Sequence, residues 1–472
     1  MIITDRIVSG NYMANIKFGT DGWRAVVGKE FNDENVHKVI KSVGKYVYDN
    51  FGLKKKIIIG YDPRNMAYEY AKKSARQLCE YGFNVLLSDK IIPTPVLAFN
   101  AKFLNACAVM FTASHNPPEY LGIKFIPDYA GPATSDITDE LVNNLNKDFS
   151  VNEAGNIDIY DFSNAYFEQI EKLINFEKIK SLKTNIIFDG LYAASIGYFD
   201  KLLEKHGIKY DSLHMFHDKN FGGGMPEPKP KYLKELIKKI KAAPNSVGFA
   251  NDGDSDRFGI INENGEYVSP NEIISILLIH LNKNKHLNGV LIKTVGASLL
   301  LNKVADKIGV KVIETAVGFK HVGEAMRNYD AIIGGEESGG LSIKGHIPEK
   351  DGILANLLVL EAMAYEQKTL VQLQKDLYKL AGCEFYNDRI DIKLNDFDCI
   401  KSIIQEYKTK TCIGKYKIKN TDLKDGVKLY FDDNSSWILI RPSGTEPLLR
   451  IYFESNSTEK LEELKKLIQT KL

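Results

Sequence analysis

Residues 288–315, "NGVLIKTVGASLLLNKVADKIGVKVIET", contain the pattern that decides the fold. A short apolar run near its start is followed by apolar residues at helical spacing, and then by a second short apolar run near its end. Such short runs, bounded by turn residues, are typical of buried strands. We therefore predict two parallel strands joined by a helix within these residues.

The same alternation occurs twice earlier in the chain. Residues 54–111 contain "KKKIIIGYD", "FNVLLSD" and "NACAVMF" with a helical segment, "YEYAKKSARQLCEYG", among them, and residues 184–207 read "TNIIFDGLYAASIGYFDKLLEKHG". Three α/β units in series are indicated, each with a mainly parallel sheet. The final part instead contains four strand candidates and a closing helix at 457–472, which is typical of a smaller α+β domain. We predict domains at 1–153, 154–262, 263–378 and 379–472.

Composition restricts the partners and the compartment. Length alone, 472 residues, suggests about three domains, and 44% hydrophobic content is typical of globular chains. A formal net charge of +1 gives no overall positive electrostatic potential that would attract nucleic acid or an anionic membrane. The five cysteines lack metal-ligand spacing, and the first dozen residues lack a secretory signal. No apolar run is long enough to span a membrane. We expect a cytoplasmic location.

Four polar loops follow predicted strands. "TASHNP" follows "NACAVMF", "NDGDSDR" follows "SVGFA", "GEESGG" follows "YDAIIG", and "RPSGTEPLLR" follows "WILI". Ligands bind beyond the carboxyl ends of strands in open α/β sheets. Each predicted domain therefore offers one loop of different chemistry at a position suited to binding.

The second loop favours a hard cation. Three carboxylates alternate with small residues, and carboxylate oxygens are the ligands that Mg²⁺ prefers: Asp252, Asp254 and Asp256. An EF-hand, with Glu263 as its last ligand, is disfavoured because Arg257 occupies its glycine position. The flanks also read as strands, with Asn264 and Gly265 forming a hairpin turn. A solvated acidic turn remains the alternative for this loop taken alone.

The first loop places Ser114 beside His115, with Lys124 close in sequence. Taken alone, it is more typical of a turn that caps a helix than of a nucleophile, and no Gly-x-Ser-x-Gly elbow surrounds it. With an acidic loop elsewhere, however, the serine fits a phosphate carrier. A phosphoserine would supply a further oxygen to a metal that withdraws charge during transfer.

The remaining loops carry groups suited to a sugar phosphate. Glycine backbone, hydroxyls and guanidinium groups can bind a phosphate dianion: Arg441, Ser443, Gly444, Thr445 and Arg450. The acceptors Glu336, Glu337 and Ser338 suit vicinal hydroxyls of a sugar. The stretches "VGFKH" and "GHIPEKDG" add two lysines and two histidines, which could equally be surface residues: Lys320, Lys350, His321 and His346.

Together, these motifs resemble the α-D-phosphohexomutase superfamily, specifically its phosphoglucomutase and phosphomannomutase members. The resemblance extends from "KFGTDGWRA" to "RPSGTEPLLRIYFE" and includes one motif per domain, in the family's order. It implies a four-domain architecture around a central cleft. Three topologically similar α/β domains would be followed by a smaller C-terminal α+β domain that closes on the substrate.

The resemblance also implies roles for individual residues. Ser114 would be the phosphoserine, and it would bind Mg²⁺ together with Asp252, Asp254 and Asp256, while Arg257 accompanies them. The catalytic residues would be Ser114, Lys124, Arg24, His115 and Lys350. Among them, Lys124 would be the acid/base. Glu336 and Ser338 would contact sugar hydroxyls, and Lys320 would be a cleft lysine. The phosphate that does not react would be held by Arg441, Ser443, Gly444, Thr445 and Arg450.

The implied activity is that of a phosphoglucomutase. It would interconvert glucose 1-phosphate and glucose 6-phosphate through a glucose 1,6-bisphosphate intermediate, which also acts as activator, in a monomer or homodimer. Mannose phosphates are possible further substrates. The alternatives are a phosphomannomutase, a phosphoglucosamine mutase, a metal-dependent phosphatase and a non-catalytic phosphosugar-binding protein.

Several positions depart from the family's pattern. Leu121 replaces a usual asparagine, and Gly340 stands where many bacterial phosphomannomutases have a histidine, so that Lys350 or His346 would have to supply any second acid/base. Thr112 and the doubled glutamate differ from the "SASHNP" and "GEQSGH" loops usual in phosphoglucosamine mutases. These departures favour glucose phosphates.

Overall fold

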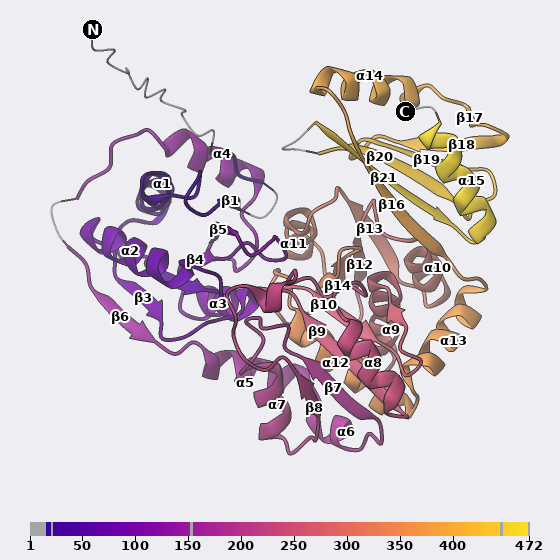
Figure 1. Cartoon of the computed structure of the whole chain (residues 1–472), viewed down its shortest axis with the longest axis horizontal. Helices are drawn as coiled ribbons and strands as arrows, with labels where there is room; N and C mark the ends of the chain where they lie inside the picture. Colours follow the sequence, from indigo (N-terminus) through magenta and orange to yellow (C-terminus); the bar gives the residue numbers. More distant parts are fainter. Residues whose placement is uncertain (1–15, 20–21, 152–153, 444–446, 471–472) are drawn as a thin grey trace, which may run out of the picture.

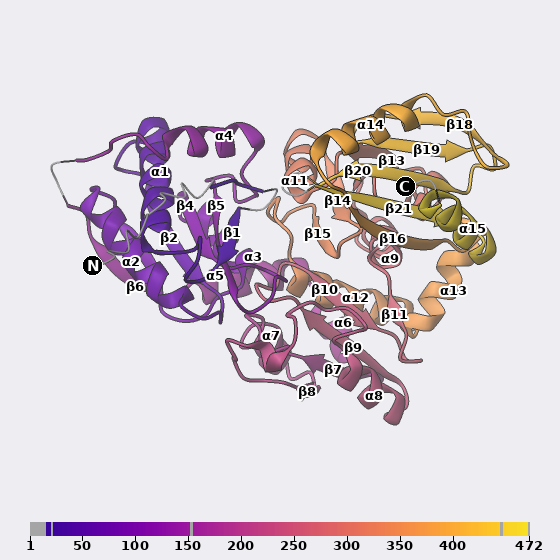
Figure 2. The same ribbon diagram turned by 45° about the horizontal axis from the view of Figure 1, so that its top comes forward.

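The computed structural model describes residues 16–19, 22–151, 154–443 and 447–470, which form four successive sheets with helices packed against them (Figure 1). The expected fold class is confirmed: the first three sheets are mixed and carry helices, and the fourth is antiparallel. In both views the indigo first domain and the yellow fourth domain lie apart, with the second and third domains between them (Figure 2). No described helix is both long enough and apolar enough to cross a bilayer.

The first sheet has the strand order β1-β5-β4-β2-β3-β6. Its elements are β1 (Trp23–Val26), α1 (Asp33–Phe51), β2 (Lys56–Tyr61), α2 (Ala67–Glu80), β3 (Val85–Ser88), α3 (Thr94–Phe103), β4 (Ala106–Phe111), β5 (Tyr120–Ile126), α4 (Ser135–Asn144) and β6 (Ile157–Tyr160). Successive residues of β2 enter two different cores: Ile58 packs on one face, and Ile57 and Ile59 pack on the other. Because both faces are covered, the strand is apolar throughout.

The second sheet has the order β11-β10-β9-β7-β8. Its part of the chain contains α5 (Ser163–Leu173), α6 (Phe176–Lys180), β7 (Asn185–Asp189), α7 (Phe199–Lys205), β8 (Asp211–Leu213), η1 (Phe221–Gly223), α8 (Lys234–Ala242), β9 (Ser246–Asn251), β10 (Phe258–Ile261) and β11 (Tyr267–Val268). Strands β10 and β11 pair antiparallel, and Gly265 in their turn has φ 75°. The predicted hairpin is confirmed, and with it the strand argument against an EF-hand.

The third sheet has the order β13-β12-β14-β15. Its elements are α9 (Pro270–Lys283), β12 (Val290–Thr294), α10 (Leu299–Lys307), β13 (Lys311–Thr315), α11 (Phe319–Asn328), β14 (Ala331–Glu336), β15 (Gly340–Ile343), α12 (Gly352–Glu366) and α13 (Leu370–Ala381). Strands β12 and β13 are parallel and joined by α10, as residues 288–315 predict. Helix α12 is apolar on almost every side because it contacts elements of both the second and third domains.

One strand arrangement is common to the first three sheets. The strand orders β3-β2-β4-β5, β8-β7-β9-β10 and β13-β12-β14-β15 each place three parallel strands beside a fourth, antiparallel strand. The polar loop of each domain connects the last parallel strand to this antiparallel strand. The three domains therefore present their polar loops from topologically equivalent positions.

The fourth sheet is antiparallel, with the order β16-β21-β20-β19-β18-β17. Its elements are β16 (Tyr386–Lys393), α14 (Phe397–Lys408), β17 (Cys412–Ile413), β18 (Tyr416–Asp422), β19 (Val427–Phe431), β20 (Trp437–Pro442), β21 (Leu448–Ser455) and α15 (Thr458–Gln469). Ile438 and Ile440 of β20 share a core with α14 and α15, whereas Trp437 and Leu439 pack with Val295 of the third domain. One face of this sheet thus binds its own helices, and the other binds the third domain.

Lys428 of β19 is buried in this interface between the third and fourth domains. Its ammonium donates to the carbonyl of Val295 and lies 4.0 Å from the ring centroid of Trp437. Burial, and secondly the positive charge of Lys293, lower the pKa of Lys428 to about 7, while the carboxylates of Glu314, Glu454 and Asp422 oppose the shift. Unfolding exposes the lysine and returns its pKa to about 10.4.

We expect Lys428 to make stability rise with pH between about 7 and about 10. In that window the unfolded chain binds one proton more than the folded chain. The contribution of Lys428 to stability is therefore full at alkaline pH and is lost as pH falls toward 7. Denaturant midpoints of wild type and Lys428→Met, measured from pH 6 to pH 10, test this, with the exposed Lys417→Met as the matched control. A Lys428→Met profile parallel to that of wild type would contradict the prediction.

Candidate active site

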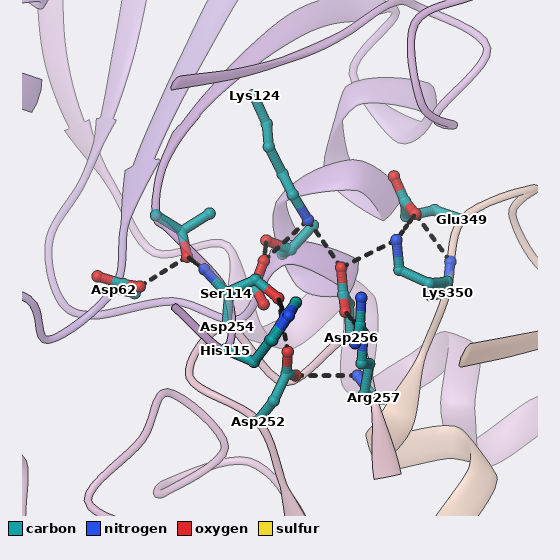
Figure 3. Close-up of polar contacts among 12 residues, drawn as sticks. Asp62, Ser114, His115, Lys124, Asp252, Asp254, Asp256, Arg257, Glu349 and Lys350 are labelled. Atoms are coloured by element: carbon teal, nitrogen blue, oxygen red, sulfur yellow. Dashed lines mark hydrogen bonds and ion pairs between the residues drawn. The ribbon is translucent and has the colours of Figure 1, made fainter. Parts of the chain in front are cut away.

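Ser114 follows β4 and lies at the junction of the first two domains. The residue is fully buried, and its φ of 51° is in the left-handed region. The hydroxyl donates to Asp252 Oδ2 at 2.7 Å, and His115 Nδ1 lies 3.3 Å from Ser114 Oγ (Figure 3). The serine loop and the acidic loop, although 138 residues apart in sequence, therefore meet through the predicted carrier.

The acidic loop contains the three predicted metal ligands, which are all fully buried: Asp252, Asp254 and Asp256. One oxygen of each lies within 4.8 Å of the others. Gly253 allows the close approach of the serine loop, because a Cβ at this position would lie 2.5 Å from the carbonyl oxygen of Ser114. The backbone N–H of Arg257 donates to Asp252 Oδ1 at 3.0 Å.

Two lysines partly neutralise these carboxylates. Lys124 of β5 donates to Asp254 Oδ2 at 2.9 Å and Asp256 Oδ2 at 2.7 Å, and the ammonium of Lys350 lies 3.2 Å from Asp256 Oδ2 (Figure 3). Burial and then the charges of Asp256 and Asp254 raise the pKa of Asp252 well above its usual value. A divalent cation would remove this repulsion.

The donor set fits Mg²⁺. It consists of carboxylate oxygens on an alternating loop, together with the Ser114 hydroxyl on Asp252, and Mg²⁺ binds such oxygen ligands. Asp256 Oδ1 is buried and accepts no hydrogen bond from the described residues. These features point to an oxygen-lined cation site and not to a solvated turn.

The predicted sugar-binding loop, residues 335–340, lies next to the acidic loop, residues 251–257. The backbone N–H of Phe258 donates to the carbonyl of Gly339 at 3.0 Å. Ser338 Oγ donates to Glu336 Oε1 at 2.5 Å, and burial raises the pKa of Glu336 against the opposing charges of Lys350 and Arg257. The predicted sugar contacts thus stand beside the carboxylate and lysine cluster.

Arg24 and Lys320 lie in different surroundings. Arg24 of β1 donates from Nη1 to Asn116 Oδ1 at 2.8 Å, which places it at the serine loop. Lys320 of α11 instead donates to Ser135 Oγ at 2.9 Å, near the start of α4 in the first domain. The structure therefore brings Arg24 to the predicted site, whereas it places the ammonium of Lys320 at an exposed contact between the first and third domains.

The predicted phosphate loop joins β20 and β21. Arg441 and Arg450 are directly opposite in the antiparallel ladder, and Arg441 Nε donates to Asp425 Oδ2 at 3.1 Å. The backbone N–H of Ser443 donates to the carbonyl of Leu448 at 2.7 Å. Like charges in opposite positions of a ladder repel, and an anion bound between them would relieve the repulsion. Gly444 and Thr445 lie outside the described residues.

The side chain of His346 is fully buried beside Phe99, Tyr166 and Asp351. Its Nε2 lies 3.0 Å from Asp351 Oδ2, and Tyr166 OH donates to the same carboxylate oxygen at 2.9 Å. The ring also stacks on Phe99. Two residues were candidates for a second acid/base. The contacts of His346 are those of a structural residue, whereas Lys350 lies beside Asp256.

Sequence reasoning missed Asp62 and Arg64, which follow β2. Both side chains are fully buried and form an ion pair at 3.2 Å beside the serine loop. Burial raises the pKa of Asp62 to about 6, and the charge of Arg64 opposes the shift. The signal was present in "YDPRN", because two opposite charges directly after an all-apolar strand also form a polar strand-end loop.

Comparison with known proteins agrees with this arrangement. Models of the phosphoglucomutase/phosphomannomutase family match residues 15–152 (α/β/α domain I), 164–265 (domain II), 269–381 (domain III) and 410–471 (C-terminal domain). A phosphoglucomutase/phosphomannomutase of Thermococcus kodakarensis is 30% identical over 94% of this chain and 96% of its own. A phosphoglucosamine mutase of Methanococcus vannielii is 31% identical over 93% and 94%, respectively.

Solved structures show the same fold. A crystal structure from Thermus thermophilus, assigned as a phosphomannomutase, has a TM-score of 0.86 and 29% identity, and the match covers 97% of this chain and 99% of that one. The open form of the Paramecium phosphoglucomutase parafusin has a TM-score of 0.81 and 23% identity, with 96% and 94% covered.

The fold and the buried serine, aspartate and lysine cluster define a phosphosugar mutase, an enzyme of the isomerase class. The chain belongs to the phosphoglucomutase/phosphomannomutase family of the α-D-phosphohexomutase superfamily.

Proposed function

We propose that the protein interconverts the 1-phosphate and 6-phosphate of an α-D-hexose through a phosphoserine at Ser114, with glucosamine phosphate as its preferred substrate. The observation that carries the phosphoserine mechanism is the contact of Ser114 Oγ with Asp252, within a cluster that also contains Lys124. Glucose phosphate and mannose phosphate are the second candidates.

The transfer step uses groups already in contact. The bond between phosphorus and Ser114 Oγ breaks, a bond from phosphorus to the free sugar hydroxyl forms, the hydroxyl proton passes to a base, and Oγ recovers a proton. Lys124, with Lys350 beside it, is positioned to exchange these protons. Mg²⁺ held by Ser114 and the three aspartates would withdraw charge from the phosphoryl group. The hexose bisphosphate then turns and returns its other phosphate to Ser114.

Two loops support binding in both orientations. Glu336 and Ser338 offer acceptors to sugar hydroxyls, and Arg441, Ser443 and Arg450 offer donors to the phosphate that does not react. A site that binds neighbouring polar groups of the sugar ring together with a terminal phosphate can accept a bisphosphate in either orientation. Desolvation of the cluster would protect the phosphoserine from hydrolysis.

The preference for an amino sugar rests on the relatives and on charge. The Methanococcus protein bears the name phosphoglucosamine mutase, and we give this name more weight than the mild contrary indication from Thr112 and the doubled glutamate, although the Thermococcus relative of similar identity is named phosphoglucomutase/phosphomannomutase. A protonated 2-amino group is a cation, whereas the 2-hydroxyl of glucose is neutral. The sugar loop carries two adjacent carboxylates, Glu336 and Glu337, which would attract that cation.

A substrate panel tests this proposal. Glucosamine, glucose and mannose 1-phosphates would be incubated with Mg²⁺ and a trace of the matching 1,6-bisphosphate, and ³¹P NMR would follow the 6-phosphates directly. We expect kcat/KM for glucosamine phosphate to exceed the others by about tenfold, the effect of one additional charged contact. A reversed order would assign the enzyme to glucose or mannose phosphates. Turnover of none, with release of inorganic phosphate, would identify a phosphatase and overturn the mutase proposal.

Gly340 gives a separate test of Lys350. A Cβ at position 340 would lie 2.3 Å from Lys350 Cδ and 2.7 Å from its Cγ. We expect Gly340→Ala to displace the Lys350 ammonium from Asp256 and to lower kcat/KM about tenfold. The unfolding temperature should change little. A double-mutant cycle with Lys350→Ala provides the control. If Gly340→Ala costs as much in the Lys350→Ala background, its effect does not act through this lysine.

A further inference from the structure

Arg64 binds the main chain of the serine loop at four points. Its Nη2 donates to the carbonyls of Ser114 at 2.6 Å and Asn116 at 2.7 Å, and its Nη1 donates to those of Pro117 at 2.7 Å and Tyr120 at 3.1 Å. The planar guanidinium presents donors in fixed directions, which allows one side chain to hold several carbonyls at once. The arginine thus fixes the loop from the residue that would carry phosphate to the first residue of β5.

Asp62 links the same arginine to the other side of Ser114. Its Oδ2 accepts from Arg64 Nε at 3.2 Å and from Thr112 Oγ1 at 2.6 Å. Thr112 Oγ1 in turn accepts from the backbone N–H of Ser114 at 2.8 Å. Both the N–H and the carbonyl of Ser114 are therefore fixed by one ion pair, and Figure 3 shows Asp62 beside the loop.

The second domain covers this ion pair. The ring of Phe221 lies 5.0 Å from the guanidinium carbon of Arg64, and Gly253 packs against the carbonyl of Ser114. Fixing both backbone groups of Ser114 holds it in its left-handed conformation, which is unfavourable for a residue with a side chain. A loop released from Arg64 would relax and turn Oγ away from Asp252.

We propose that Arg64, together with Asp62, is a positioning residue for phosphoryl transfer: it aims Ser114 Oγ at the acidic loop without touching the substrate. This inference rests on the proposed function of Ser114. It goes beyond a role in folding, because the four carbonyls and the Thr112 link converge on the residue that transfers the phosphate.

The test compares Arg64→Lys with wild type. Lysine keeps a positive charge beside Asp62, but a single ammonium cannot hold four carbonyls in two directions. We expect kcat to fall about 10- to 100-fold while KM changes less than about twofold, because misplacing the carrier affects transfer more than substrate binding. The ³¹P resonance of the phosphoserine should also shift and broaden.

A second pair of variants keeps the test valid if Arg64→Lys folds poorly. Thr112→Val removes the link to Ser114 N–H, and Thr112→Ser retains it, so kcat should fall in the former and be restored in the latter. Val39→Ala, in the buried face of α1, serves as a destabilised control with unchanged kcat, and Arg76→Lys as an exposed one.

The outcomes separate this inference from the proposed function. If the wild-type enzyme turns over and Arg64→Lys and Thr112→Val have the same kcat per folded molecule, only the positioning role is overturned. A wild type that takes up no phosphate and isomerises no hexose phosphate would overturn the proposed function and this inference together.

Discussion

Replacing Ser114 by alanine is expected to abolish mutase turnover, with a loss of at least about a thousandfold, because the variant lacks the hydroxyl that carries the phosphoryl group between the two sugar oxygens. The fold should persist. Asp252 keeps the hydrogen bond from the backbone N–H of Arg257, and alanine adopts the left-handed conformation at a cost similar to that of serine.

Two measurements check this expectation. Mass spectrometry of the intact protein after incubation with a hexose 1,6-bisphosphate should show one added phosphoryl group in wild type and none in Ser114→Ala. The ³¹P NMR assay should show turnover only in wild type. Ser402→Ala on α14, where the serine is exposed, is the matched control and should behave as wild type. Turnover that survives in Ser114→Ala would remove the serine from the mechanism.

The α/β architecture could be predicted from sequence because its strands have a local cause. Strand β2 is buried on two sides, so its residues form an unbroken apolar run, and α1 shows helical spacing because only one of its faces is buried. The polar loops could be found for the same reason: a serine or three aspartates directly after such a run stand out. Local pattern therefore located the loops.

Other features depend on contacts between distant parts of the chain. Helix α12 has no apolar periodicity because second-domain and third-domain elements cover it on several sides. His346 could not be distinguished from a surface or catalytic histidine, since its burial depends on Tyr166, whose hydroxyl contacts Asp351 from 185 positions away. The role of Arg64 likewise appears only when the serine loop folds over it. Sequence indicates which loops matter, whereas packing decides which residues support them.

Removing divalent metal is expected to lower turnover at least about a hundredfold, and adding Mg²⁺ should restore it. Three fully buried carboxylates within 4.8 Å of one another repel strongly, and the ion pairs that the two lysines form within this triad are with Asp254 and Asp256. Asp252 instead accepts from the neutral hydroxyl of Ser114. Its charge is therefore the one that a cation would balance most directly.

The role of the metal can be tested without relying on turnover alone. Wild type should bind Mn²⁺, followed by electron paramagnetic resonance, at one site that Mg²⁺ displaces, and Asp252→Asn should weaken this binding at least about tenfold, the loss of one charged ligand. Asp398→Asn is the matched control, because that carboxylate is 87% exposed on α14. Full turnover after chelation, with no Mn²⁺ bound, would mean that Lys124 and Lys350 alone neutralise the cluster. The lysines would then replace the metal in balancing the phosphoryl charge. In that case Lys124→Met would have to lower turnover more than chelation does.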